Sequence, residues 1–217
     1  MNGIFQIGSS PTSTKPLSLL TNCHRRIEAA LDALSQVAAG ARTLTPDSRA
    51  ALERSLRFFR DMGPKHTADE EQSLFPRLRT LGQGLEQLSA LEGDHHAAEA
   101  WHAEVEQIGN AWLESGTLSQ EQGELLSDLV AKLNCLYREH IHLEDTVVFP
   151  LAERVLSHEQ QEEVRREMNS RRAITIQVAT LLLLVSLGTG WAQTKVGSVV
   201  LSGSVRTRVE AWDWFSN

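Results

Sequence analysis

The sequence predicts an all-α fold: an up-down-up-down four-helix bundle with a short fifth helix and a C-terminal hydrophobic segment. Two observations support this prediction. Apolar residues recur at helical spacing in four long stretches joined by short connections, and no strand-like alternation occurs before residue 190 of the 217. Short connections favour antiparallel neighbours, and amphipathic helices bury their apolar faces against one another.

The first two helices are predicted between Pro16 and Gly40 and between Thr45 and Pro76. Leucine and isoleucine recur at helical spacing along the first stretch until Gly40 ends it. Thr45 and the proline after it provide a cap and a first-turn residue for the second helix. We expect Pro76 to close that helix.

Three further helices are predicted over 85–114, over 119–150 and from Ser157 to about Arg172. The third carries leucine, valine, isoleucine and tryptophan at helical spacing. Capping boxes open the fourth helix and the short polar fifth helix, because each starts with serine and has glutamine three residues later. We divide the chain into a lead (1–16), the bundle (17–172), a hydrophobic segment (173–194) and a disordered or strand-like tail (195–217).

Charge and cysteine content exclude several classes of protein. The net charge of −7 argues against nucleic acid as a partner, since such proteins carry a basic face. Cys23 and Cys135 form neither a Cys-x-x-Cys pair nor a disulfide framework, which favours a reducing compartment. No apolar, positively flanked stretch opens the chain, so we expect the bundle to be cytoplasmic.

One motif occurs twice, with the same spacing. His66 precedes Glu70 by four residues, and a Phe-Pro pair begins five residues after the glutamate; His140 and Glu144 repeat this arrangement. Residues four apart on a helix differ by about 40° in direction and one turn in height, so the imidazole and the carboxylate can share one ion.

The other two long helices also match each other. The first reads Leu-x-x-Cys-His24-x-x-x-Glu28 and the third reads Leu-x-x-Asp-His95-x-x-x-Glu99, so the chain is close to a twofold repeat of helix pairs. Each helix then brings one histidine inward. Four histidines with two to four carboxylates are enough for two ions in a bundle interior. Glu28 is the weakest candidate among these carboxylates.

Burial energetics favour a metal site over an ordinary core. Carboxylates on faces otherwise filled with Leu, Val and Phe cost several kcal/mol each unless a cation compensates them. Imidazole and carboxylate ligands without thiolate suit iron or manganese best, with zinc as a further choice. The predicted ligands are His24, His66, Glu70, His95, Glu99, His140 and Glu144. Solvated or supporting roles are assigned to His96, His102, His142 and His158, and surface positions to Glu71 and Asp145.

These residues resemble the hemerythrin-like, or HHE cation-binding, family. Its pattern, one histidine and then His-x-x-x-Glu before Phe-Pro, occurs twice within about residues 17–172. The two copies comprise His24, His66 and Glu70, and His95, His140 and Glu144. The resemblance implies a non-haem di-iron centre with oxygen-bridged irons and a coordination position open to dioxygen, peroxide or nitric oxide.

The sequence departs from the oxygen-carrying hemerythrins at two positions. Those proteins have a second histidine where this chain has Glu99. They also have an aspartate five residues after the fourth-helix histidine, whereas this chain has Glu144 four residues after His140. Additional carboxylate stabilises ferric over ferrous iron and weakens reversible oxygen carriage.

The sequence is compatible with three functions, which we rank in the following order. The first is a module that binds or senses O2, NO, peroxide or iron through a di-iron centre, with a protein partner still to be identified. The second is a di-iron oxidoreductase with catalase-like, peroxidase-like or ferroxidase activity, for which Tyr137 is the candidate proton shuttle. The third is a metal-free structural bundle.

The C-terminal segment allows two interpretations. Residues 174–192 are uncharged and would span about 28 Å as a helix, close to a bilayer core, with Arg171 and Arg172 before them. One interpretation is a C-terminal transmembrane helix that anchors the bundle to the inner membrane. The other is an export signal with a small-x-small cleavage site, followed by a strand-like stretch, as in an exported outer-membrane precursor fused to the bundle.

Overall fold

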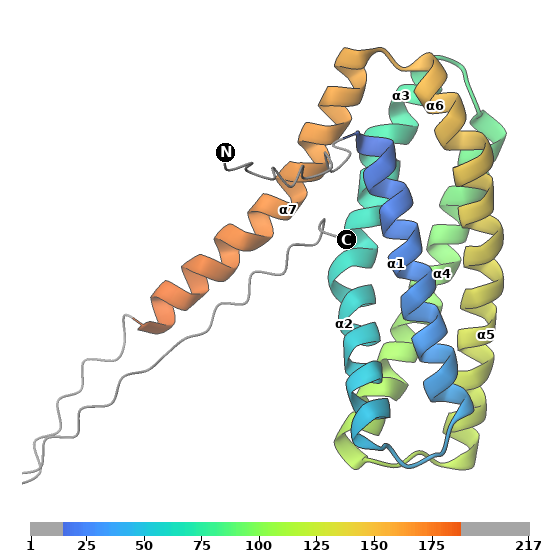
Figure 1. Ribbon diagram of the computed structural model, residues 1–217, viewed down its shortest axis with the longest axis vertical. Helices are drawn as coiled ribbons and strands as arrows, with labels where there is room; N and C mark the ends of the chain where they lie inside the picture. The colour runs from blue at the N-terminus through green and yellow to red at the C-terminus, as the bar shows by residue number, and fades with distance from the viewer. Residues whose placement is uncertain (1–14, 188–217) are drawn as a thin grey trace, which may run out of the picture.

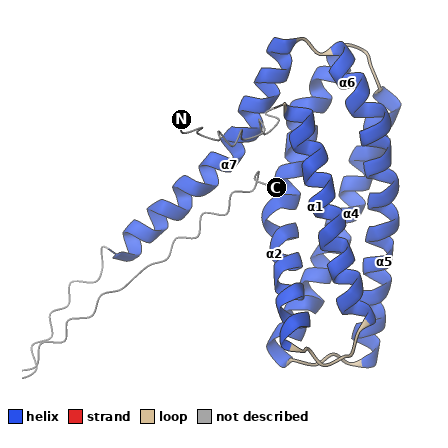
Figure 2. Ribbon diagram, in the orientation of Figure 1, coloured by secondary structure: helices blue, strands red, loops and turns tan. Residues whose placement is uncertain are grey.

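The computed structural model describes residues 15–187, with side chains as far as residue 173. Within this part the chain is helical, apart from short connections and one isolated bridge between Thr43 and Thr117 (Figure 2). The helices are α1 (Pro16–Ala39), α2 (Pro46–Asp69), η1 (Glu70–Leu74), α3 (Phe75–Thr80), α4 (Leu85–Ser115), α5 (Gln120–Leu143), η2 (Glu144–Val148), α6 (Phe149–Val155) and α7 (His158–Leu187). The all-α prediction is confirmed.

Four long helices, α1, α2, α4 and α5, lie side by side (Figure 1). Helix α1 contacts α2 and α5, and α4 contacts the same two neighbours, so the four enclose one interior. This packing is consistent with the predicted four-helix bundle. The helix starts follow the sequence: the side chains of Thr45 and Ser119 cap α2 and α5 in complete capping boxes.

Three predicted helix ends are wrong. Pro76 and Pro150 do not close their helices; each lies in the first turn of a further short helix, α3 or α6. A proline is tolerated there because its missing N–H needs no intrahelical partner. The fifth helix does not end near Arg172 but continues to Leu187, since neither glycine nor proline occurs between Arg172 and Gly188.

The interior contains two apolar clusters. The Trp112 cluster comprises Cys23, Ile27, Leu31, Leu34, Val37, Ala38, Leu52, Leu56, Phe59, Ala98, Val105, Trp112, Leu118, Leu126, Leu129, Val130, Leu133 and Ile141. The Phe75 cluster comprises Leu17, Leu20, Leu74, Phe75, Leu78, Leu88, Leu91, Val148, Phe149, Ala152, Leu156, Val164 and Met168. On α1, for example, His24 lies between Leu20 of one cluster and Ile27 of the other. The polar residues of the bundle interior are therefore sealed by apolar side chains on both sides.

Helix α7 is attached to the bundle by ion pairs near its middle. Asp69, which is fully buried at the end of α2, accepts hydrogen bonds from Arg171 at 2.8 Å and from Arg172 at 2.6 Å. Arg171 also donates to Ser73 Oγ at 2.7 Å. Val164 and Met168 are buried beside these contacts, so the first half of α7 covers α2 and α1 before the helix leans away from the bundle (Figure 1).

No described helix is long and apolar enough to cross a membrane. The predicted transmembrane helix over 174–192 therefore finds no support in residues 15–187. Residues 188–192 and the strand-like stretch predicted near the C-terminus lie outside the described residues.

Two glycines of α4 give a matched test of this packing. A Cβ at Gly109 would lie 2.7 Å from Leu56 Cδ1, whereas a Cβ at Gly93 would meet no atom within 4 Å. Gly93→Ala is expected to stabilise the protein by about 0.5–1 kcal/mol, because it removes backbone freedom from the unfolded chain. Gly109→Ala is expected to be roughly 1–3 kcal/mol less stable than Gly93→Ala, because Leu56 must move. Urea denaturation measures both, and equal free energies of unfolding would contradict the packing at Gly109.

Candidate metal centre

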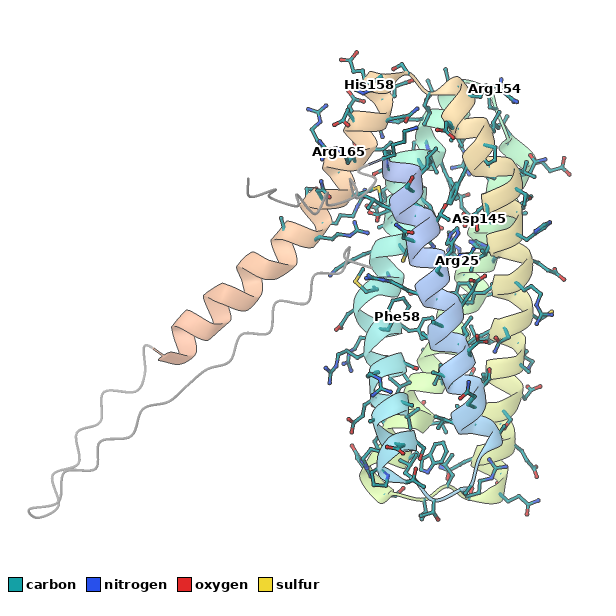
Figure 3. The ribbon with its side chains drawn as sticks, in the orientation of Figure 1. Arg25, Phe58, Asp145, Arg154, His158 and Arg165 are labelled. Atoms are coloured by element: carbon teal, nitrogen blue, oxygen red, sulfur yellow. The ribbon has the colours of Figure 1, made fainter. Side chains whose placement is uncertain are left out.

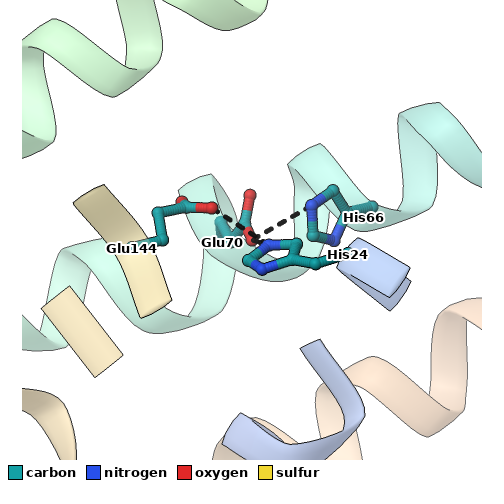
Figure 4. A group of neighbouring side chains, drawn as sticks. All are labelled: His24, His66, Glu70 and Glu144. Carbon is teal, nitrogen blue, oxygen red and sulfur yellow. Dashed lines mark ion pairs between the residues drawn. The ribbon is translucent and has the colours of Figure 1, made fainter. Parts of the chain in front are cut away.

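Histidines and glutamates from α1, η1, α2, α4, α5 and η2 meet in the sealed interior. They form two overlapping groups, in each of which the ligand atoms lie within 4.8 Å of one another. The first group is His24, His66, Glu70 and Glu144 (Figure 4), and the second is Glu70, His95, His140 and Glu144. Ligands about 2.0–2.2 Å from a metal ion lie up to about 4.4 Å apart, so a small contraction would bring each group onto one ion.

The two glutamates lie between the histidine pairs. Glu70 Oε1 lies 3.3 Å from His66 Nε2, and Glu70 Oε2 lies 3.3 Å from His95 Nε2. Glu144 Oε2 lies 3.1 Å from His24 Nε2 and 3.3 Å from His140 Nε2. Each carboxylate thus reaches one histidine of each group, which is the placement that a bridging ligand between two ions requires.

The inward-facing atoms have no other role among the described residues. The Nε2 atoms of all four histidines and both carboxylate oxygens of Glu70 and Glu144 are buried without a well-formed hydrogen bond. Buried polar atoms are normally satisfied, because each unsatisfied one costs free energy. Eight such atoms in two overlapping groups fit bound cations that would coordinate them.

Three outer carboxylates hold the histidines from behind. Nδ1 of His24 donates to Asp145 at 2.8 Å, and Nδ1 of His95 donates to Glu71 at 2.8 Å. Nδ1 of His140 lies 3.3 Å from Asp94. Such contacts fix the ring orientation and leave Nε2 free for a metal ion.

The placement of Glu71 and Asp145 on the surface was a wrong prediction, and the two π-helices explain it. In η1 and η2 the N–H groups of Phe75 and Phe149 bond to the carbonyls of Glu70 and Glu144, five residues earlier. A π-turn holds more residues than an α-turn, so neighbouring side chains diverge less than the 100° assumed from α-helical geometry. The ligand glutamate points inward while the next acid reaches the histidine of another helix. The only signal in the sequence was an acid directly after each ligand glutamate.

Charge pairing inside the site shifts the pKa values strongly. Burial lowers the pKa of His24, but its hydrogen bond to Asp145 and the close carboxylates of Glu144 and Glu70 outweigh burial and raise this pKa to about 12. Burial also lowers the pKa of His66, whereas Glu70 and then Cys23 raise it to about 9. Burial raises the pKa of Glu70, but His66, His24 and His95 bring it below its usual range. Without a metal ion, protons on the histidines balance the buried carboxylates.

The sequence comparison agrees with this geometry. The hemerythrin HHE cation-binding domain matches residues 15–152, which is more than half of the chain. The chain belongs to this hemerythrin family. No curated protein matches it in a sequence search.

Six of the seven ligands predicted for the hemerythrin site come together, and Glu99 does not. Glu99 is exposed on α4 and belongs to neither group, even though it repeats the four-residue spacing after His95. A four-residue spacing after an inward histidine is therefore not sufficient to place a carboxylate in the site. Glu28 pairs with Arg25 at 2.9 Å and is also outside both groups.

The remaining histidines of the hemerythrin domain lie off the site, as predicted. His96, His142 and His158 are exposed. His102 is half-buried, its Nε2 lies 3.1 Å from the Tyr137 hydroxyl, and burial lowers its pKa to about 4. His102 is therefore neutral at pH 7.

A cavity of about 450 Å³ lies between α2 and α4 and reaches the metal centre. Its lining includes Glu71 and His95 at the metal site, the His102 and Tyr137 pair, and apolar side chains such as Phe59. A small molecule in this cavity would contact the His95 side of the centre.

The outer carboxylates yield a prediction for metal affinity. Asp145→Asn and Glu71→Gln are each expected to weaken metal binding about 10- to 100-fold, because removing a carboxylate behind a metal-binding histidine lowers its basicity and loosens its orientation. Competition with a calibrated chelator measures the change. Asp128→Asn, which removes only an exposed pair with Lys132, is the control and should bind as the parent protein does. Unchanged affinity in both outer variants would contradict the assigned role.

Proposed function

We propose that this protein is a non-haem di-iron protein of up-down-up-down bundle topology that binds or senses O2, NO or peroxide. The observation that carries the proposal is the sharing of Glu70 and Glu144 by two histidine pairs. Two carboxylates between four imidazoles suit a pair of ions better than a single one. The oxygen and nitrogen donor set, without a thiolate among the ligands, favours iron over the alternatives manganese and zinc.

The outer carboxylates support a binding role with the ferric state favoured. Asp145, Glu71 and Asp94 add negative charge behind three of the histidines. Negative charge stabilises the higher oxidation state, so the reduced protein should respond to an oxidant or NO rather than carry oxygen reversibly. Bound iron would supply redox chemistry and Lewis acidity, and the buried histidines and glutamates of the chain would hold and orient it.

Iron content tests the proposal first. Protein reconstituted with ferrous iron and passed over a desalting column should retain two irons per chain by plasma mass spectrometry. Its oxidised form should absorb in the near ultraviolet. Retention of less than one iron, with manganese and zinc also excluded by the same measurement, would establish the metal-free bundle instead. Binding of NO by the reduced protein, followed optically, then tests the ligand.

The oxidoreductase alternative is favoured by the cavity beside His95. Its Tyr137 and His102 pair could move a proton between a substrate in the cavity and the site. Oxygen evolution from peroxide, or oxidation of ferrous iron over many turnovers, would support this alternative. Tyr137→Phe should then slow turnover while iron content stays at the parent value. Stoichiometric reaction without turnover would leave the binding role.

A further inference from the structure

The two halves of the metal centre are not built alike. We call His24 and His66 the first position, and His95 and His140 the second position. Both positions share Glu70 and Glu144, so their inner donors are equivalent. The difference lies in the groups behind the imidazoles.

At the second position both imidazoles have an outer carboxylate. Glu71 lies 2.8 Å from Nδ1 of His95, and Asp94 lies 3.3 Å from Nδ1 of His140. Arg79 lies near Glu71, but its 2.6 Å ion pair is with Glu92. The second position therefore has two carboxylates that can raise the basicity of its imidazoles.

At the first position only His24 has such a partner. Nδ1 of His66 is buried and has no well-formed hydrogen bond among the described residues. The polar group next to His66 is the buried thiol of Cys23. Cys23 precedes His24 in α1 as Asp94 precedes His95 in α4, so a thiol stands where the internal repeat has a carboxylate.

The one outer carboxylate of the first position is also partly neutralised. Asp145 Oδ2 lies 2.6 Å from Arg25 Nη2, while Asp145 Oδ1 accepts from His24 (Figure 3). An arginine on the carboxylate withdraws negative charge from the imidazole behind it. Arg25 Nη1 also lies 2.9 Å from Glu28, so this arginine is shared by two carboxylates. The second position therefore has two outer carboxylates, whereas the first has one, which is paired with an arginine.

We propose that Cys23 and Arg25 make the two positions unequal, so that the second position fills first and the first position is the one that exchanges its ion. The inference rests on the proposed binding of two metal ions. Loss of one outer partner lowers metal affinity about 10- to 100-fold, and we expect a gap of this size between the two binding steps.

Cobalt(II) is a suitable probe because it takes nitrogen and oxygen ligands as ferrous iron does. With one equivalent of cobalt, anomalous diffraction from crystals should place the ion between His95 and His140. A competitive titration should give two steps about 10- to 100-fold apart. Equal anomalous peaks at the two positions would overturn the inference and leave the di-metal function standing, whereas no bound cobalt at either position would overturn both.

Variants test the cause of the difference in affinity between the two binding steps. Cys23→Asp should tighten the weaker step and bring the two affinities together, and Asp94→Cys should weaken the stronger step. Arg25→Gln, at a side chain that is 53% exposed, should tighten the weaker step without a change inside the core. Cys135→Ser, at the exposed cysteine, is the matched control. It should keep the difference between the two affinities that the parent protein shows. A parent-sized gap in both folded Cys23→Asp and Arg25→Gln would overturn the inference.

Discussion

Glu70→Gln is expected to reduce metal affinity at least 100-fold at both positions and to leave less than one ion per chain after desalting. Glu70 faces His66 through one oxygen and His95 through the other, so one substitution removes a ligand from each position. The amide keeps the size of the side chain but lacks the negative charge that a dication requires. Plasma mass spectrometry of the reconstituted variant measures the loss.

Glu99→Gln is the control for Glu70→Gln. The exposed Glu99 side chain belongs to neither ligand group, so this variant should keep two ions. Circular dichroism verifies that both variants fold. Two ions in folded Glu70→Gln, or loss of an ion in Glu99→Gln, would contradict the ligand assignment.

Removal of the metal is expected to destabilise the protein far more at pH 8.5 than at pH 6. In the metal-free protein, the pKa of His66 is raised to about 9 and that of His24 to about 12, from an unfolded value near 6.5. A raised histidine pKa contributes stability that is complete below pH 6.5 and is lost as the pH rises through the folded pKa. The lowered pKa of Glu70 contributes above about pH 4.5 and is lost in acid. The metal-free protein should therefore be most stable between about pH 5 and 6.5.

The stability that bound metal adds should increase as the pH rises above 6.5. Metal ions bind neutral imidazole, so affinity rises as protons leave. Free metal at about 1,000 times the dissociation constant adds about 4 kcal/mol, which corresponds to roughly 8–16 °C in Tm for a chain of this size. Thermal unfolding with and without a chelator at the two pH values measures the effect. For Glu70→Gln, with affinity at least 100-fold weaker, the same free metal adds about 1.4 kcal/mol or less, so its Tm shift should fall to roughly a third of the parent shift or below. Identical Tm values for the parent with and without chelator at pH 8.5 would contradict the prediction.

Helical periodicity was sufficient to predict the all-helical structure and six inner donors. His66 and Glu70 span the junction of α2 and η1, and His140 and Glu144 span that of α5 and η2. The N–H of each glutamate still bonds to the carbonyl of its histidine four residues earlier, so sequence spacing translates directly into direction there. His24 and His95 followed from the internal repeat. These features depend only on local geometry, and the structure brings all six donors together.

The outer residues could not be predicted in the same way. Glu71 and Asp145 reach their histidines only because the backbone widens into π-turns, for which composition and spacing give no recognised signal. Glu99 shows the converse error, since it has the right spacing but lies on regular α-helix at the surface. Which acidic side chain points into the site depends on the local backbone conformation within the packed bundle, and sequence spacing alone does not predict it.

The arginine contacts of α7 extend the minimum folding unit beyond the family match. Asp69 directly precedes Glu70, and its two oxygens are held by Arg171 and Arg172, about twenty residues after the matched region ends at residue 152. A chain truncated at that end would lose both partners of Asp69 and would expose the Phe75 cluster, because Val164 and Met168 of α7 belong to it. A shortened version of the protein that is meant to bind metal should therefore include the chain through Arg172.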